Sequence, residues 1–134
     1  MYDYIDRPLE GLAERQRFLV WAMRLWVMSK HQARCSVRAV EPLFREKEAE
    51  GALGAFHCLM SVLARHTRCP LHFSAPCCPS VAEGEALLLT LIGAAGHVPP
   101  EDLAARCEGL IGDERAPELA FVVDRLAGAL AEAD

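Results

Sequence analysis

The sequence predicts an all-α protein, a single-domain bundle of five to six helices over residues 1–134 with one loop rich in cysteine and proline. The chain has 134 residues, 52% hydrophobic and 25% charged, which is enough apolar material to bury one core. Apolar residues recur at helical spacing along most of its length. No internal repeat, low-complexity run or long linker divides it, so we expect one domain.

The longest predicted helix covers residues 9–31, with Pro8 placed where a first helical turn tolerates proline. Its apolar residues cover most of the circumference and leave a narrow polar stripe. The stripe consists of Arg17, Arg24 and His31. We expect a central bundle helix, or one that meets a protein partner or a second copy of the chain. The residues available for that contact are Trp21, Trp26 and Met28.

Two shorter helices are predicted at residues 36–48 and 49–66, and one kinked helix over both ranges is an alternative. Ser36 is a candidate cap for the first of them. In residues 67–80, three prolines within fourteen positions exclude a regular helix. Next, Ser80 and Glu83 have the spacing of a capping box and predict a helix over residues 82–95.

Two more helices complete the bundle. Pro99 and Pro100 open one that runs to Ile111, and Pro117 opens another that runs to Glu132. The apolar face of this last helix is formed by Leu119, Val122, Val123, Leu126 and Leu130.

Charge is distributed unevenly along the chain. Residues 51–80 contain two arginines and no carboxylate, whereas residues 81–134 contain eleven acidic and three basic residues, a net charge of −8. With −5 overall, the chain lacks the basic surface of a nucleic-acid binder, although its acidic part could meet a basic partner. The longest apolar run is too short to span a membrane, and the N-terminus has no secretory signal. We expect a cytoplasmic protein with no nucleic-acid or membrane partner.

The candidate site is the loop over residues 69–78, because thiolate and imidazole are the ligands of tetrahedral zinc. The predicted ligands are Cys69, His72, Cys77 and Cys78, with Cys58 as a substitute. Their spacing is unlike that of a standard zinc motif, and adjacent cysteines rarely bind one ion well. Iron–sulfur ligation, haem bound through Cys69-Pro70 and Cys78-Pro79, or no cofactor at all are the alternatives.

A second hypothesis for the same loop needs no metal. Cys77 and Cys78 stand just before a predicted helix, whose free amides lower the pKa of a nearby thiol. Such a thiol could sense redox state, form a mixed disulfide, or pair with its neighbour. The sequence therefore predicts a loop that binds a metal ion or senses redox state.

The competing hypothesis is a helical protein-interaction module whose cysteines only pack in the core, as expected for Cys35, Cys58 and Cys107. No phosphate-binding, dinucleotide-binding, metalloprotease or serine-hydrolase motif is present, so we do not predict an enzyme.

The loop from Cys69-Pro70-Leu71 through Ala75-Pro-Cys-Cys-Pro79, followed by Glu85-Ala-Leu-Leu-Leu89, resembles a family of small proteobacterial proteins of unknown function. The likeness covers about a third of the chain. It implies a bacterial cytoplasmic setting and no particular activity, and it directs attention to the double cysteine rather than to Cys35 or Cys107.

Overall fold

The fold is that of a helical bundle, as a computed structural model shows for residues 4–67 and 71–133. Within these residues there are six α-helices, one short 3-10 turn and no strand, which confirms the all-α prediction. The elements are η1 (Leu9–Gly11), α1 (Glu14–His31), α2 (Ser36–Glu46), α3 (Glu50–His66), α4 (Glu83–Ala94), α5 (Pro100–Ile111) and α6 (Ala116–Ala133).

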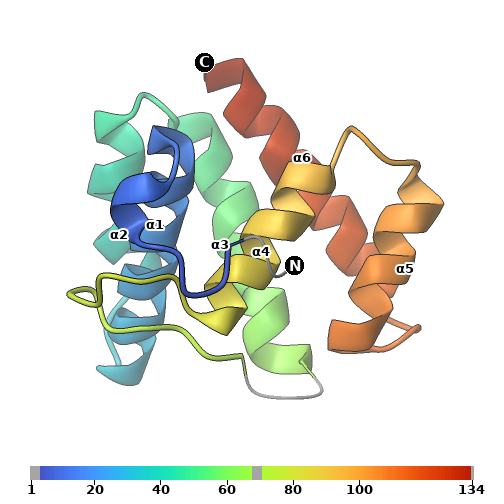
Figure 1. Cartoon of the computed structure of the whole chain (residues 1–134), viewed down its shortest axis with the longest axis horizontal. Helices are drawn as coiled ribbons and strands as arrows, with labels where there is room; N and C mark the ends of the chain where they lie inside the picture. The colour runs from blue at the N-terminus through green and yellow to red at the C-terminus, as the bar shows by residue number, and fades with distance from the viewer. Residues whose placement is uncertain (1–3, 68–70, 134) are drawn as a thin grey trace.

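The last helix, α6, is the most shared element. α1 and α2 pack together at one end of the molecule and α5 lies at the other, while α6 packs against α3, α4 and α5 (Figure 1). Its buried face contains the five apolar residues that the periodicity predicts. The core position expected for residues 9–31 is confirmed for α1, whose buried residues include Leu19, Met23 and Trp26, and α6 is a second core helix.

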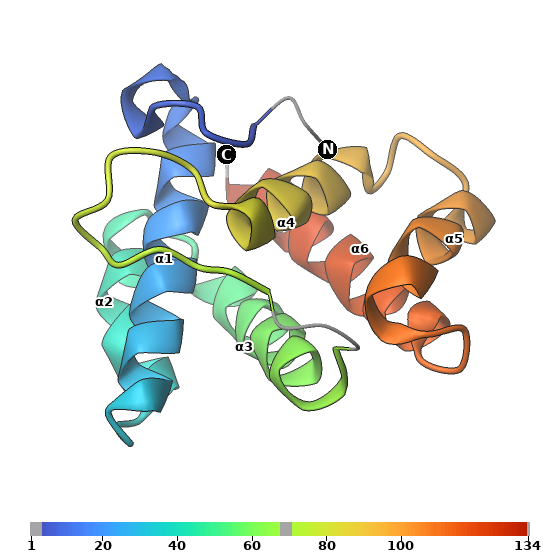
Figure 2. The same ribbon diagram turned by 60° about the horizontal axis from the view of Figure 1, so that its bottom comes forward.

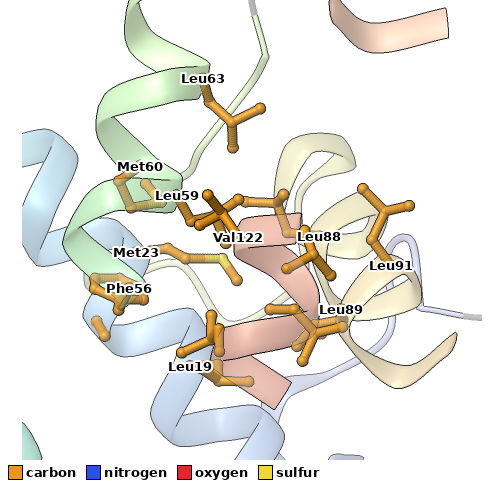
Figure 3. Packing of buried hydrophobic residues seen from close by; sticks show 14 of the residues in the cluster. Leu19, Met23, Phe56, Leu59, Met60, Leu63, Leu88, Leu89, Leu91 and Val122 are labelled. Carbon is orange, nitrogen blue, oxygen red and sulfur yellow. The ribbon is translucent and has the colours of Figure 1, made fainter. Parts of the chain in front are cut away.

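One hydrophobic core joins all six helices. Figure 3 shows Met23 of α1, Leu59 of α3, Leu88 of α4 and Val122 of α6 converging on the same interior volume. Each of these four side chains is buried. Burial of these side chains follows from helix packing, because each helix must bury its apolar stripe against another.

Helix boundaries differ from the predicted ones where backbone geometry intervenes. The first helix begins at Glu14 rather than at residue 9, because Leu9–Gly11 form a separate 3-10 turn. Residues 36–66 form two helices and not one kinked helix. Glu48 adopts a φ of 56°, a left-handed conformation that ends α2 before α3 begins. The Ser36 hydroxyl donates to the carbonyl of Trp26, so it joins α2 to α1 and does not cap α2.

The chain before α1 pairs with the chain before α4. The amides of Asp6 and Leu9 donate to the carbonyls of Val81 and Pro79, both at 2.9 Å, and the Val81 amide donates to the Arg7 carbonyl at 2.9 Å. An isolated antiparallel bridge joins Pro8 and Ser80. This pairing anchors the C-terminal end of the cysteine loop to the surface of the bundle.

Helix α1 carries the clearest departure from the expected pattern. Of the predicted polar stripe, Arg17 and His31 are exposed, but Arg24 is only 1% exposed. Trp26 is also buried, so of the two tryptophans proposed for a partner contact only Trp21 remains at the surface, 42% exposed.

Candidate functional site

The described part of the cysteine loop, residues 71–82, runs across α1 before turning into α4 (Figure 2). Its first residues lie close against the start of α4, where the Gly84 amide donates to the His72 carbonyl at 2.9 Å. A Cβ at position 84 would come within 2.6 Å of that carbonyl oxygen. Glycine is required here because the loop backbone occupies the space of a side chain.

Arg24 of α1 binds the backbone of the loop through its guanidinium group. Its Nη1 donates to the carbonyl of Cys78 at 2.7 Å and, at 3.5 Å, to that of Pro76, and its Nη2 donates to the carbonyl of Ser80 at 2.8 Å. Its Nε and Nη2 also donate to the two carboxylate oxygens of Glu85, at 2.8 and 2.9 Å. The guanidinium and the carboxylate thus form a bidentate pair with two parallel hydrogen bonds. One buried side chain therefore binds the carbonyls of three alternate loop residues.

Glu85 completes the arrangement from α4. Besides Arg24, it accepts hydrogen bonds from the amide of Ser74 at 3.0 Å and the amide of Ala82 at 2.9 Å. Glu85 and Arg24 are 0% and 1% exposed. A buried charged pair is stable only when its remaining hydrogen-bonding capacity is also satisfied, and the loop backbone satisfies it.

The predicted capping box of Ser80 and Glu83 is wrong. The helix begins two residues later than Ser80 would require, with Ala82 at the N-cap position and the Glu85 carboxylate accepting the Ala82 amide. The Ser80 backbone is instead used to bind Arg24. Glu83 is exposed.

The two adjacent cysteines differ in environment. Cys77 is exposed, while Cys78 is half-buried and its thiol donates to the Ser80 carbonyl, with sulfur and oxygen 3.5 Å apart. Hydrogen bonding with the Ser80 backbone, then with the Ser74 and Ser80 hydroxyls, lowers the pKa of the Cys78 thiol. Burial opposes this effect and the positive charge of Arg24 supports it. The pKa is thus lowered although the contact with the Ser80 carbonyl, which only the protonated thiol can make, favours the neutral form.

The remaining predicted ligands do not converge on this pair. His72 is exposed at the other end of the loop, and Cys58 is exposed on α3, where it lines a groove towards α6. Cys69 lies outside the described residues. Within residues 4–67 and 71–133, no group of three or more His, Cys, Asp or Glu side chains could hold a metal ion. Zinc and iron–sulfur binding stay predictions.

The haem prediction requires an apolar slot beside the loop. A pocket of about 260 Å³ lies there, between α1, α3 and the loop, with Trp26, Met60, Leu63 and Phe73 in its lining. This volume lies just below the usual range of ligand-binding pockets. Haem binding also stays a prediction.

At the edge of this pocket, the Trp26 Nε1 donates to the His57 Nδ1 at 3.0 Å. Burial, and then the positive charges of Lys30 and Arg65, lower the pKa of His57. The imidazole is therefore held in its neutral form, as an acceptor for the indole.

The predicted packing role is correct for one of three cysteines. Cys107 is fully buried in α5, and burial raises the pKa of its thiol to about 11. Cys35 lies exposed at the N-cap of α2, and Cys58 is exposed because the buried face of α3 is formed by other residues. Those residues are Ala52, Phe56, Leu59, Met60, Val62 and Leu63.

The pair of Arg24 and Glu85 was not anticipated from the sequence. Its signal was the position of Arg24 within the most apolar stretch of the chain, where a charged side chain requires a buried partner. That partner lies 61 positions away, and nothing local in the sequence distinguishes Glu85 from the other acidic residues.

No protein-family model, curated protein or solved structure matches this chain. The resemblance to a proteobacterial family consequently stays a prediction. Among the described residues, no helix combines the length and the apolar character needed to cross a bilayer.

Proposed function

We propose that the chain is a thiol-based redox-responsive protein, in which Cys78 is the reacting residue and Cys77 is the second thiol. The observation that carries this proposal is a shared acceptor. The Ser80 carbonyl accepts both the buried Arg24 guanidinium and the Cys78 thiol. The thiol therefore sits on the same hydrogen-bond network that holds the loop to the core.

The reaction we propose is thiol–disulfide exchange with a low-molecular-weight disulfide. The Cys78 thiolate attacks one sulfur, the disulfide of the reagent breaks, and the other half leaves as a thiolate that takes up a proton. Cys77 can then attack the mixed disulfide at the Cys78 sulfur. This second exchange forms a Cys77–Cys78 disulfide, releases a second thiol, and leaves the two electrons of the cysteine pair on the reagent.

Modification of the Cys78 thiol is expected to disturb the hydrogen bonds of the buried Arg24–Glu85 pair. A mixed disulfide removes the thiol proton that now faces the Ser80 carbonyl and adds a group beside it. The carbonyls of both Cys78 and Ser80 are acceptors for Arg24. A change of sulfur chemistry is therefore passed to the contact between the loop and α1, which is the element a redox response would alter.

The test compares the rate of mixed-disulfide formation at each cysteine. The protein is incubated with glutathione disulfide at pH 7 and modified sites are located by mass spectrometry. We expect Cys78 to react faster than Cys35 and Cys58, which are both exposed, because its surroundings lower the pKa of its thiol and raise its thiolate fraction.

Three variants give the matched controls. Cys78→Ser should abolish the fast phase, Cys77→Ser should trap the mixed disulfide on Cys78, and Cys35→Ser should change neither. Cys107 should react only after unfolding, because it is buried. Equal rates at Cys35, Cys58 and Cys78 would refute the redox proposal. Zinc near one equivalent in the purified protein, lost in Cys77→Ser or Cys78→Ser, would replace it with the metal-binding hypothesis.

A further inference from the structure

A second candidate site is a groove beside α5, the helix at the end of the molecule opposite α1 and α2 (Figure 1). It has a volume of about 590 Å³ and lies between α5 and α6, and residues of the turn before α5 also line it. Its apolar lining consists of Val98, Pro100, Leu103, Ala104, Ala120 and Phe121. The volume falls within the range of established binding pockets.

Phe121 is the most exposed large apolar side chain in the described part of the chain. It is 62% exposed on α6, whereas Trp21, the other such residue, is 42% exposed and lies on α1. The guanidinium carbon of Arg125 lies 6.0 Å from the centre of the Phe121 ring. An exposed aromatic ring beside an apolar groove is the usual anchor of a protein–protein contact.

The charged residues in the groove lining are acidic, whereas Arg125 lies beside the groove, over the ring of Phe121. Glu101 and Asp124 are in its lining, both exposed, and no lysine, arginine or histidine is in that lining. Neither carboxylate forms an ion pair with another described residue. Of the basic residues nearby, Arg115 pairs with Glu118 and Arg125 lies over Phe121. The groove thus offers an apolar floor and two unpaired negative charges.

We propose that this groove binds a basic amphipathic helix of a partner protein, whose apolar side chains pack beside Phe121 and whose lysine or arginine residues meet Glu101 and Asp124. Charge complementarity selects this occupant. A second copy of the chain is a poorer match, because residues 81–134 carry a net charge of −8 and two such surfaces repel each other. The inference is independent of the cysteine loop, which lies on α1 and α4.

The test uses a fluorescein-labelled amphipathic peptide of leucine and lysine, fourteen residues long, with a leucine and glutamate peptide of the same pattern as the control probe. Binding to the full-length protein is followed by fluorescence anisotropy at 50 and 300 mM salt. We expect micromolar binding of the lysine peptide, weakened at least threefold by the higher salt, and at least tenfold weaker binding of the glutamate peptide.

Matched variants test whether the lysine peptide binds at the groove. Phe121→Ser should weaken binding of the lysine peptide at least tenfold, whereas Trp21→Ser, which also removes an exposed aromatic ring, should leave it within twofold. Glu101→Gln with Asp124→Asn should weaken binding at least fivefold and reduce its salt dependence. Glu108→Gln with Asp113→Asn, an equal charge change outside the groove lining, should leave it within twofold.

Each of four results would overturn the inference. They are no binding of the lysine peptide at 100 µM, equal binding of both peptides, equal losses in the Phe121 and Trp21 variants, and equal losses in the two charge-neutralised pairs. A dimer in light scattering that Phe121→Ser dissociates would assign the groove to a second copy instead. None of these results depends on the reactivity of Cys78, so this inference and the redox proposal fail separately.

Discussion

Replacing Glu85 with alanine removes four accepted hydrogen bonds at once, two from Arg24 and one each from the amides of Ser74 and Ala82. It also leaves the guanidinium of Arg24, 1% exposed, without its counter-charge. Breaking a buried pair in this way costs about 3–5 kcal/mol. Since a domain of this kind has a free energy of unfolding of about 5–15 kcal/mol, the variant should fold but be much less stable.

The assay is urea unfolding followed by circular dichroism and tryptophan fluorescence. With a slope of about 1.5 kcal/mol per molar urea, a loss of 4 kcal/mol lowers the unfolding midpoint by roughly 2.5 M. Arg24→Met should cost a comparable amount, because the Glu85 carboxylate stays buried and three loop carbonyls lose their donor. The double variant should cost at least about 2 kcal/mol less than the two single losses together, since it leaves no uncompensated charge.

The control is the pair of Arg45 and Glu41, an exposed ion pair on α2 with the same residue types. Glu41→Ala should change the free energy of unfolding by less than about 1 kcal/mol. A loss below about 1 kcal/mol for Glu85→Ala, or strict additivity of the Arg24 and Glu85 variants, would contradict the assignment of this pair as the support of the loop.

Two further predictions concern single sites on either side of the loop. Gly84→Ala should destabilise the protein by about 1–3 kcal/mol in thermal or urea unfolding, because its Cβ would meet the His72 carbonyl at 2.6 Å. Gly93→Ala, in the same helix but facing open space, should stabilise it by about 0.5–1 kcal/mol, and equal effects at both positions would rule out the steric reason. The folded state holds the pKa of His57 below its value in the unfolded chain, so the unfolded state binds more protons and stability should fall as pH drops from 7.5 to 5.5. In His57→Asn the side chain still offers an acceptor to Trp26 but does not titrate. The melting temperature of this variant should therefore fall less between pH 7.5 and 5.5 than that of the parent protein. An equal fall in both proteins would assign the pH dependence to other groups.

The cysteine loop shows how far local sequence carries a site prediction. Its three prolines predict an irregular segment before a helix, and the structure places one there. The same sequence does not reveal which thiol is exposed and which contacts a carbonyl. That difference between Cys77 and Cys78 depends on the Ser80 backbone, whose position is set by Arg24.

The helix ends also differ in how far local sequence predicts them. Pro100 at the start of α5 predicts that boundary correctly, because proline fits the first turn whatever surrounds it. The start of α4 is predicted to within one residue but its capping pair is not, because the Ser80 carbonyl binds Arg24 and the Glu85 carboxylate accepts the Ala82 amide. A capping pattern is decided locally only when no distant group competes for the same backbone.

By itself, the sequence determined the helical class, a bundle of five to six helices with most ends placed to within a few residues, the acidic C-terminal part and the position of the cysteine loop. These follow from periodicity, prolines and composition, all of which act over a few neighbouring residues. Only the tertiary structure decided that Arg24 is buried, that Glu85 is its partner, and that an apolar groove remains open beside Phe121. Those outcomes depend on which groups meet across the core, and a buried charge is stable only where distant residues happen to complete its hydrogen bonds.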